Sequence, residues 1–338
     1  MINVGIIGAG RIGQVHGKSI LSGVSGACIR AVADPYLTQQ AIDWAKGAGI
    51  EGIYTDYHKI LEDDKIDAVL ICSSTDTHAQ LSIEAIEAGK HVFCEKPIDH
   101  KLSRIAEVEA ALAKSEKQLV YQVGFNRRFD HNYRALRQAV RDGKVGDVQF
   151  IRISSRDPEP PPAGYVKSSG GIFLDMMIHD LDMLRYLSGL EVEEVYAQGA
   201  VLIDPAIGKE GDVDTATVSA RLSSGALALI DNSRKAVYGY DQRAEVFGSK
   251  GSVQIGNDAA STAVLSTTEG VVSEKPLWFF LERYTAAYQG EIASFLQSIE
   301  KGSAAEVGVQ DGRMSIRLAL ACKLSLEENR PVKLSEIQ

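Results

Sequence analysis

The hydrophobic pattern changes near the middle of the chain. Up to residue 125, nearly continuous apolar runs alternate with segments whose apolar residues recur at helical spacing. The apolar runs cover residues 4–10, 29–34, 68–74, 91–97 and 119–125, and the helical spacing covers 12–22, 38–47 and 77–89. Such runs are typical of strands buried on both faces, and strands that alternate with helices predict βαβ units and a parallel sheet.

From Phe150 onward, apolar and polar residues alternate one by one along several segments. These segments are 150–156, 192–202, 215–222, 226–234, 242–248 and 251–256. Turn-forming sequences such as Ser223-Ser224-Gly225 separate them, which is typical of antiparallel strands with one face in water. We therefore predict a large, open, mostly antiparallel sheet.

Helical patterns interrupt and follow this second sheet. The spacing predicts helices over residues 170–187, 282–300 and 311–329, the last of them ended by Pro331. Prolines at positions 158, 160, 161 and 162 predict a stiff, exposed loop before the first of these helices. The predicted fold class is α/β, with a parallel-sheet domain over residues 1–122 and an α+β domain over residues 123–338. The closing helices are free to pack back on the first domain.

A glycine-rich loop follows the first predicted strand. It matches the pattern G-x-G-x-x-G, and its residues are Gly8, Gly10, Arg11, Ile12 and Gly13. A strand precedes the loop, a helix follows it, and the second strand ends in an acid 21 residues after the last glycine. This context predicts a Rossmann dinucleotide-binding domain, because the glycines let a pyrophosphate approach the backbone at the helix N-terminus. Glycines that serve only strand–helix packing are the alternative.

The acid at the end of the second strand is Asp34, and it predicts which dinucleotide binds. Its carboxylate can accept hydrogen bonds from the adenosine ribose and repels a 2′-phosphate, which favours NAD over NADP. Arg11, inside the glycine-rich loop, is the residue able to soften this preference.

Composition and charge exclude several classes of partner. Lys and Arg number 36 against 45 Asp and Glu, a net charge of −9 that no basic run offsets, so we expect no nucleic acid or anionic membrane as partner. We find no apolar segment long enough to span a bilayer and no signal-peptide pattern. The four cysteines lack CxxC spacing, so we expect free thiols and a cytoplasmic location.

Two further strand ends carry polar side chains, and ligands of doubly wound sheets bind at the carboxyl ends of the strands. The first set suits hydrogen bonds to a ribose and consists of Ser73, Ser74, Thr75 and His78. A helix N-cap by Thr75 or Thr77 is the alternative for this turn.

The second set is Glu95-Lys96-Pro97, at the end of the next apolar run. The peptide before proline is restricted and is able to be cis. We expect Glu95 and the Lys96 ammonium to face the cofactor, whereas a solvent-exposed lysine is the alternative.

The segment LDMMIHDLDM places acids and an imidazole in an apolar surrounding. Read as one helix, it puts Asp175, His179 and Asp182 at positions i, i+4 and i+7, on one stripe. A metal site, a proton-transfer pair and a hydrogen-bonded core histidine are the three interpretations. A metal needs a third ligand and an open position, and the chain has no histidine-rich segment to supply them, so we expect no metal. The role of Asp182 stays open.

Several segments occur in an informative order: GIIGAGRIGQVH, SSTDTH, HVFCEKP, QVGFNRRFD and GGIFLDMMIHDLDM. In this combination the chain resembles the glucose–fructose oxidoreductase/inositol dehydrogenase (Gfo/Idh/MocA) family. SRKAVYGYDQRAEVFGSKG and the closing helices also fit, so the likeness covers nearly the whole chain. SSRDPEPPPAGY further resembles the inositol-oxidising members. The resemblance implies a Rossmann NAD domain followed by a domain for substrate binding and oligomerisation.

The resemblance also implies roles for individual residues. Lys96 matches a lysine that lies near nicotinamide and substrate in relatives. His179 matches the histidine that takes the proton from the substrate hydroxyl, and Asp175 matches an aspartate that hydrogen-bonds the substrate or orients the imidazole. The further substrate contacts that it implies are Arg127, Asp157, Tyr238 and Tyr240.

The chain departs from the family on one predicted strand. Several members carry a histidine there, whereas this chain has Ser155, Arg156 and Asp157, which leaves the polyol contacts on this side open. Which of Tyr238 and Tyr240 faces the substrate is also open.

The chemistry of alcohol oxidation requires groups of this kind. Oxidation with NAD moves a hydride to the nicotinamide and a proton to a base that titrates near neutrality. His179 suits that base, Asp175 would hold its tautomer, and the Lys96 ammonium would stabilise a developing alkoxide.

We therefore expect an NAD-dependent enzyme that oxidises a cyclic polyol, first of all myo-inositol to its 2-keto product. The alternatives are another inositol isomer, glucose or another pyranoside or anhydrosugar, and, from a different class, a non-catalytic NAD-binding regulator. The sequence does not rank the polyols, because epimers differ only in hydrogen-bond geometry. The open sheet face and the resemblance predict a homo-oligomer, a dimer or tetramer.

Overall fold

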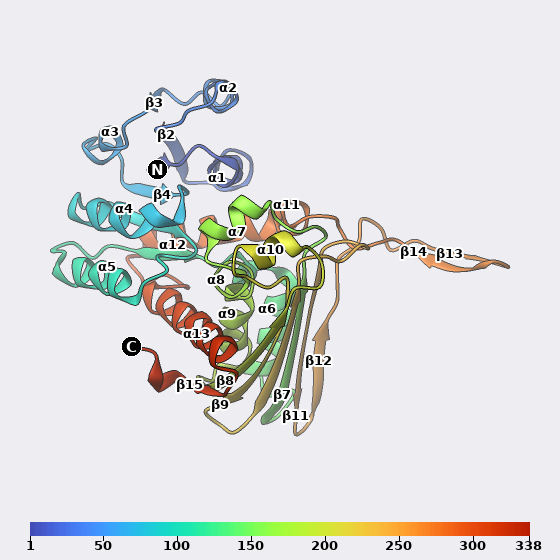
Figure 1. Cartoon of the computed structure of the whole chain (residues 1–338). Helices are drawn as coiled ribbons and strands as arrows, with labels where there is room; N and C mark the ends of the chain where they lie inside the picture. The colour runs from blue at the N-terminus through green and yellow to red at the C-terminus, as the bar shows by residue number, and fades with distance from the viewer. The chain divides into compact units, whose positions relative to one another are not determined.

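The computed structural model describes residues 1–338, except for the side chain of Ala163, and contains two compact units (Figure 1). Unit 1 comprises Met1–Phe129 and Ala286–Ile316, and unit 2 comprises Asp130–Thr285 and Arg317–Gln338. These limits differ from the predicted division at residues 122 and 123. The chain keeps its contacts with the first sheet through the 3₁₀ turn η1 (Asn126–Phe129), and helix α12 (Thr285–Lys301) returns to that unit.

Unit 1 contains a six-stranded parallel sheet with the order β3-β2-β1-β4-β5-β6. Its strands are β1 (Ile2–Ile7), β2 (Ala27–Ala33), β3 (Gly52–Tyr54), β4 (Ala68–Ile71), β5 (His91–Glu95) and β6 (Tyr121–Gly124). The helices between them are α1 (Arg11–Gly23), α2 (Gln39–Gly47), α3 (His58–Leu61), α4 (Thr75–Glu87) and α5 (Leu102–Lys114). This is the predicted Rossmann arrangement. The pattern missed β3, because three residues are too few to show a period.

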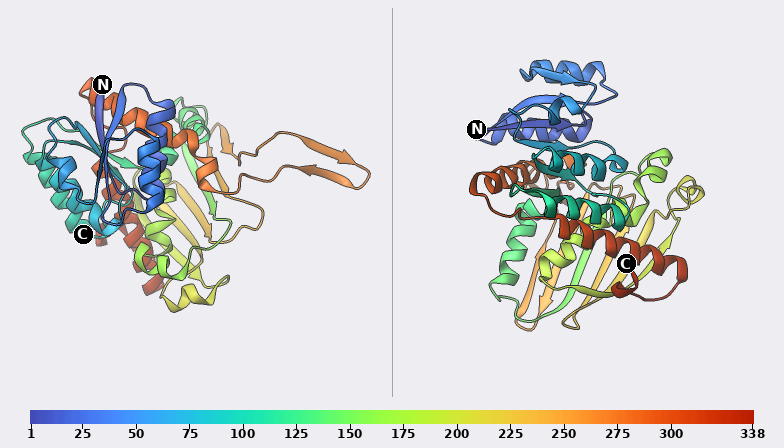
Figure 2. Two further views of the ribbon diagram at one scale, coloured as in Figure 1. Left: turned by 90° about the horizontal axis from the view of Figure 1, so that it is seen from above. Right: turned by 90° about the vertical axis from the view of Figure 1, so that its left-hand side faces the viewer.

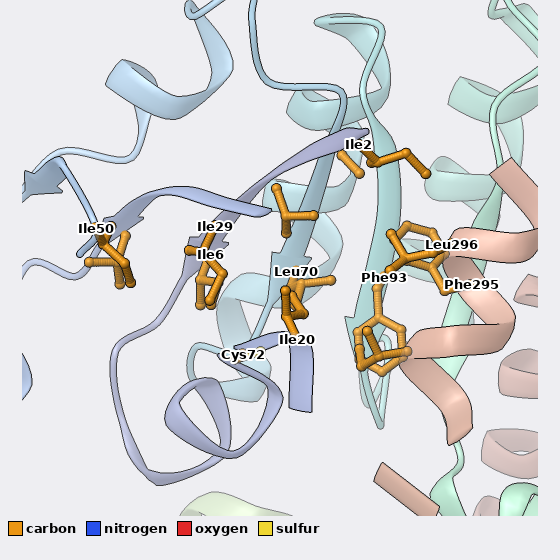
Figure 3. Close-up of a cluster of buried hydrophobic side chains, with 14 of the residues drawn as sticks. Ile2, Ile6, Ile20, Ile29, Ile50, Leu70, Cys72, Phe93, Phe295 and Leu296 are labelled. Carbon is orange, nitrogen blue, oxygen red and sulfur yellow. The ribbon is translucent and has the colours of Figure 1, made fainter. Parts of the chain in front are cut away.

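The core of unit 1 explains why α12 belongs to it. Figure 3 shows Ile6 and Leu70 on the sheet and Phe295 and Leu296 on α12, all within one apolar cluster. Phe93 of β5 makes an edge contact with Phe295, with ring centroids 5.9 Å apart. The apolar face of a late helix thus covers a sheet built from the first part of the chain, and removing that area from water stabilises the unit.

The first sheet aligns three strand ends. Ile7 pairs with Ala33 on one side and Ile71 on the other, so β1, β2 and β4 end at the same edge. Residues that follow these strands are therefore brought together there. The backbone N–H of Gly8 donates to the Ala33 carbonyl at 2.8 Å, which fixes the start of the glycine-rich loop.

Unit 2 contains a seven-stranded mixed sheet with the order β12-β11-β7-β10-β9-β8-β15. Its strands are β7 (Val148–Arg156), β8 (Val192–Ala200), β9 (Thr215–Leu222), β10 (Leu227–Ser233), β11 (Asp241–Gly248), β12 (Gly251–Ile255) and β15 (Val332–Lys333). Six of them match the predicted strands closely, and only β7 and β10 pair in parallel. Helix α6 (His131–Arg141) contacts β11 and β12. The predicted open, mostly antiparallel sheet is confirmed.

The single helix predicted over residues 170–187 is wrong. The structure has α7 (Ala163–Ser169), α8 (Ile172–Asp175) and α9 (Ile178–Ser188), and Met176 and Met177 separate the last two. Gly170 and Gly171 have φ values of +85° and +88°, a region that favours glycine, and they separate α7 from α8. The predicted stripe is therefore split, and Asp182 is fully buried.

The rest of unit 2 includes a projecting hairpin, β13 (Val264–Thr267) and β14 (Gly270–Ser273), whose residues are all exposed. Figures 1 and 2 show it extending away from the seven-stranded sheet. The remaining elements are α10 (Pro205–Lys209), α11 (Phe280–Arg283), α13 (Val309–Glu328), which runs from unit 1 into unit 2, and η2 (Leu334–Glu336). Among the described residues, no helix is long and apolar enough to cross a membrane.

The glycine-rich loop gives a stability prediction. A Cβ at Gly13 would lie 2.0 Å from the carbonyl oxygen of Gly8, whereas a Cβ at Gly10 would meet no atom within 4 Å. Gly13→Ala should therefore lower the free energy of unfolding by about 3 kcal/mol, and Gly10→Ala should leave it nearly unchanged. Urea unfolding monitored by circular dichroism measures both, and equal stability of the two variants would contradict this account of the loop.

Candidate functional site

The glycine-rich loop in unit 1 is shaped for close approach to its backbone. Gly8 has a φ of +102°, and a Cβ there would lie 2.5 Å from the Cys72 carbonyl carbon. Helix α1 begins at Arg11 with Gly10 as its N-cap, a residue that has no side chain to cover the first N–H groups. A helix start of this kind is able to bind an anion such as a pyrophosphate. Arg11 is exposed and Ile12 is partly buried beside it.

The Asp34 carboxylate is oriented by the same loop. One oxygen accepts the N–H of Ala9 at 2.8 Å, and the other accepts the N–H of Tyr36 at 2.8 Å. Each carboxylate oxygen retains capacity for a further hydrogen bond, so ribose hydroxyls still find acceptors. The loop and Asp34 therefore fit an NAD-type dinucleotide at the edge where β1 and β2 end.

The turn after β4 contains the predicted ribose contacts. Ser74 is the N-cap residue of α4 and Thr75 is its first residue. The hydroxyls of Ser73 and Thr77 lie 2.7 Å apart, and the Thr77 hydroxyl also donates to the Ser74 carbonyl. Ser73, Ser74 and Thr75 thus stand at the strand edge, as predicted, while the turn also organises the start of α4.

His78, the remaining residue of this predicted set, differs from the others in its burial and in its partners. The side chain is buried, and its two ring nitrogens lie 2.8 Å from the Pro97 carbonyl and 3.1 Å from the Ser73 carbonyl. Burial lowers the pKa of His78, but interactions with Cys94 and with both carbonyls outweigh it and raise the pKa to about 9. Because both nitrogens serve the backbone, His78 joins the α4 turn to the loop after β5.

The Lys96–Pro97 peptide is cis, in agreement with the restriction expected before proline. Lys96 is partly buried directly after β5. Its backbone N–H lies 3.3 Å from one oxygen of Glu95, whose other oxygen is 2.6 Å from His16 Nε2. His16 was not identified from the sequence as a partner of Glu95. The only sequence feature that could have drawn attention to it is its position three residues after Gly13, in the helix that follows the glycine-rich loop.

The arginine-bearing turn after β6 also lies in unit 1. Arg127 is buried within η1, and the neighbouring Arg128 donates to Asp311 at 2.9 Å. Arg128 thereby attaches the turn to the start of α13. Arg128 therefore has a structural role, and Arg127, the predicted substrate contact, is buried next to it in the same turn.

Unit 2 holds the acid and the imidazole of the LDMMIHDLDM segment. Asp175 ends α8 and His179 lies in the first turn of α9, and both side chains are partly exposed. One oxygen of Asp175 accepts the Tyr165 hydroxyl at 3.0 Å, and the other accepts Arg234 Nη1 at 3.0 Å. The guanidinium stabilises the ionised carboxylate, so Asp175 is suited to orient a neighbouring group or to attract a positive charge. The imidazole of His179 is the group suited to take a proton.

Arg234 is a second residue that sequence reasoning missed. It follows β10 and is 2% exposed, and its Nη1 also lies 3.8 Å from Asp157, another predicted substrate contact. Its Nε and Nη2 have no hydrogen-bond partner among the described residues. The structure thus brings Asp157 and Asp175 together around one guanidinium. An arginine just past a strand end was the available signal.

The remaining acids of the segment have their side chains inside unit 2. Asp180 accepts the Ser155 hydroxyl at 2.5 Å and Asn232 Nδ2 at 2.9 Å, which attaches α9 to β7 and β10. Ser155 therefore serves the fold, and Asp180 acts as an anchor for the helix that carries His179. Asp182 is equally buried, and its role remains unassigned.

The two candidate tyrosines differ in exposure. Tyr238 is 38% exposed, and its hydroxyl donates to Asp241 at 2.6 Å and accepts from Arg156 at 3.2 Å. Burial and the hydrogen bond to Asp241 raise the pKa of Tyr238, so it remains a phenol at neutral pH. Tyr240 is 7% exposed and makes an edge contact with Tyr284. Tyr238 is therefore the more accessible of the two.

Comparison with known proteins places both units among described relatives. A family model described as "Oxidoreductase family, NAD-binding Rossmann fold" matches residues 2–125, and one described as "GFO/IDH/MocA C-terminal domain" matches residues 133–254. A myo-inositol 2-dehydrogenase from Thermotoga maritima is 48% identical over 337 residues, which cover 99% of each chain. An inositol 2-dehydrogenase from Rhizobium meliloti is 44% identical over 335 residues, again 99% of each.

A solved structure extends this likeness to three dimensions. The scyllo-inositol dehydrogenase from Lactobacillus casei, with bound cofactor NAD(H) and scyllo-inositol, matches with a TM-score of 0.91 at 33% identity. The match covers 99% of each chain.

The charge compensation around Arg234 gives a prediction. Arg234→Met keeps most of the side-chain volume but leaves Asp157 and Asp175 without their shared cation, so we expect the free energy of unfolding to fall by about 3 kcal/mol. Urea unfolding measures this. Arg141→Met, at an exposed position at the end of α6, removes the same charge and should leave stability unchanged. Equal effects of the two substitutions would mean that Arg234 does not offset the two carboxylates.

Proposed function

The chain belongs to the Gfo/Idh/MocA oxidoreductase family, and we propose that it is an NAD-dependent dehydrogenase that oxidises myo-inositol to 2-keto-myo-inositol (scyllo-inosose). The observation that carries this proposal is the full-length identity of 48% to a myo-inositol 2-dehydrogenase. The chain retains the glycine-rich loop, Asp34, Lys96 and the Asp175/His179 pair, which together meet the chemical needs of alcohol oxidation.

NAD supplies the hydride acceptor when it is bound, and the chain supplies binding and proton transfer. The N–H groups at the start of α1 would hold the pyrophosphate, and Asp34 would accept hydrogen bonds from the adenosine ribose. The negative charge of Asp34 supports NAD over NADP, because a 2′-phosphate would be repelled there.

We assign the proton acceptor to His179. A secondary alcohol is a very weak acid, so its proton must pass to a base as the hydride leaves. An imidazole titrates near neutral pH, whereas Asp175 is stabilised as an anion by Arg234 and is a weaker base. Asp175 would orient the substrate or the imidazole, and the ammonium of Lys96 would stabilise negative charge on the alkoxide oxygen.

The substrate contacts proposed beyond these residues are Arg127, Asp157, Tyr238 and Tyr240. Hydroxyl groups of a cyclic polyol suit such carboxylate, guanidinium and phenol partners, and a mismatched hydroxyl leaves one of them unpaired. The second candidate substrate is scyllo-inositol, which the Lactobacillus casei relative holds. Glucose, other pyranosides and a non-catalytic NAD-binding role are the further alternatives.

The proposed activity is tested by a screen for NADH formation. Inositol isomers and aldoses are supplied with NAD, and NADP is run in parallel. We expect the highest kcat/KM with myo-inositol and NAD. A clear preference for an aldose or for NADP would contradict the substrate or the role of Asp34, and NAD binding without hydride transfer to any polyol would favour the regulator.

In the same assay we expect His179→Ala to lower kcat by about 10²–10⁴-fold, because the proton acceptor is lost. NAD affinity, measured by calorimetry, should stay nearly unchanged. His131→Ala removes an exposed imidazole from the same unit and serves as the control. Turnover of His179→Ala at the rate of the unmodified enzyme would exclude His179 as the base.

We also propose that the enzyme works as a homo-oligomer in the cytoplasm, where its four cysteines stay free thiols. Leu227, Phe150 and Phe247 lie in register across β10, β7 and β11, so they form one row on a single face of the second sheet. Leu227 and Phe247 are exposed, which supports burial of this face against a second copy.

Light scattering tests the oligomer. We expect the mass of a dimer or tetramer, and Phe247→Glu should reduce it because a charge would interrupt the apolar row. Val271→Glu, on the exposed hairpin, is the matched control. A mass equal to one chain for the unmodified protein would contradict the proposed assembly.

A further inference from the structure

Unit 1 contains a buried cluster of three ionisable side chains that the proposed chemistry does not use. His16 lies on α1, Glu95 ends β5 and Glu291 lies on α12. His16 Nε2 is 2.6 Å from Glu95 Oε1, and His16 Nδ1 is 4.0 Å from Glu291 Oε1. The imidazole is held between Phe93 and Tyr288, with ring centroids at 4.9 Å and 5.6 Å. It therefore stands between two carboxyl groups in a fixed orientation.

Glu291 is the unusual member of this cluster. Its side chain is completely buried, and both carboxyl oxygens lack a hydrogen-bond partner among the described residues. Within the part of the chain that the structure describes, no arginine or lysine side chain is paired with it. Burial, and then the charge of Glu95, raise the pKa of Glu291 well above its usual value. An ionised carboxylate in this place would be strongly destabilising, because it would be desolvated without a counter-ion.

The two distances around the imidazole indicate where the protons are. The 2.6 Å contact to Glu95 is a charge-assisted hydrogen bond, whereas 4.0 Å to Glu291 exceeds hydrogen-bond length. If all three groups were ionised, the cluster would bury three charges, and attraction would draw Glu291 closer. With a proton on Glu291, the acids hold one negative charge, on Glu95, whose side chain is 14% exposed.

The titratable groups around this cluster include Cys72 and Cys94, Tyr288 beside His16, and Lys96, which follows Glu95. Burial, and then the charge of Glu95, raise the pKa of Cys72, so that thiol is neutral. Among the described residues, no lysine or arginine forms an ion pair with Glu291 that would offset its charge.

We propose that Glu291 holds a proton in the folded protein, and that His16, buried between the two acids, fixes the orientation of Glu95 beside Lys96. At 4.0 Å His16 Nδ1 makes no hydrogen bond to Glu291, and the 2.6 Å contact to Glu95 selects the tautomer in which Nε2–H donates. The second oxygen of Glu95 accepts the backbone N–H of Lys96 at 3.3 Å. His16 is then a positioning residue that acts on the end of β5.

This arrangement has a consequence for cofactor binding, and that part rests on the proposed dehydrogenase function. In a sheet of this order, the second half of the dinucleotide lies over the carboxyl ends of the strands beyond the switch point, to which β5 belongs. An anionic Glu95 there favours the positively charged nicotinamide of the oxidised cofactor. His16 also joins the helix of the glycine-rich loop to that strand end.

A divalent cation is the alternative occupant, since donor atoms of the three residues lie within 4.8 Å of one another. The imidazole, however, presents opposite ring nitrogens to the two acids. One nitrogen can bind one ion, so this orientation does not direct both carboxyl groups and the ring to the same point.

The proton on Glu291 is tested by Glu291→Gln, which resembles the protonated acid. A raised pKa in the folded state stabilises the protein below the unfolded pKa, and that stabilisation is lost as the pH rises through the folded pKa. Glutamine does not titrate, so the Glu291→Gln variant does not lose stability in this way as the pH rises. From pH 5 to pH 8, the stability of the variant relative to the unmodified protein should therefore rise, by up to about tenfold in the unfolding constant per pH unit.

Urea unfolding gives this comparison, with Trp278→Phe as background so that fluorescence reports Trp44 in unit 1. Glu300→Gln, an exposed position on α12, is the control and should show no pH-dependent gain. An infrared carbonyl band of a protonated carboxyl should be present at pH 7 and absent in Glu291→Gln. A flat pH difference together with no such band would overturn the proposal. A zinc-induced rise in thermal midpoint that Glu291→Gln abolishes would also overturn it, in favour of a metal site.

The positioning role is tested at His16 by calorimetry with NAD. His16→Phe keeps the packing between Phe93 and Tyr288 but removes the donor to Glu95, and should weaken binding about tenfold. His16→Gln retains an N–H able to reach Glu95 and should stay within about threefold. Equal affinities of both variants and the unmodified protein would overturn the role. These readouts do not depend on turnover, so they stand even if no polyol is oxidised.

Discussion

The parallel pairing of β1 with β2 on one side and with β4 on the other is the constraint on which the cofactor half depends. Because the strands run in the same direction, their carboxyl ends meet at one edge, and a helix must return the chain each time. The glycine-rich loop, Asp34 and the turn after β4 are consequently neighbours. The Ala9 N–H then orients the Asp34 carboxylate directly. Backbone register, rather than any one side chain, assembles this part of the site.

Unit 2 organises its chemistry by compensating charge. Arg234 lies between Asp157 and Asp175, and the buried pair Asp130–Arg283 attaches the start of α6 to α11 in the same way. Burying such ions costs solvation energy, so these pairs contribute little net stability, but removing one partner is expensive. These ion pairs instead fix the positions of the side chains and elements that they join. Asp175 is held by Arg234 and Tyr165 from two other elements, so its orientation does not depend on α8 alone.

In unit 1, the buried acid Glu291 is not compensated by a cation of this kind. No described cation is paired with Glu291, so a proton takes the place of the counter-ion. The raised pKa of Glu291 has the same cause, the cost of desolvating its charge. The two acids therefore reach opposite states: the partly exposed Asp175 is ionised beside a guanidinium, and the buried Glu291 is neutral beside an imidazole. The state of each follows from its partner, which lies far away in the sequence.

The sequence by itself determined what depends on local spacing. The strand runs, the glycine pattern, the 21-residue interval to Asp34 and the alternation of the second sheet predicted both sheets and the cofactor loop. The prediction of one helix over 170–187 was wrong. The helical spacing of apolar residues continues past the two glycines and Met176, whereas the helical backbone is interrupted there. Only the tertiary structure decided that His78 serves the backbone, that Arg234, 59 residues from Asp175, neutralises it, and that His16 meets Glu95 across 79 residues. Such contacts depend on which elements are brought together, and no local pattern contains that information.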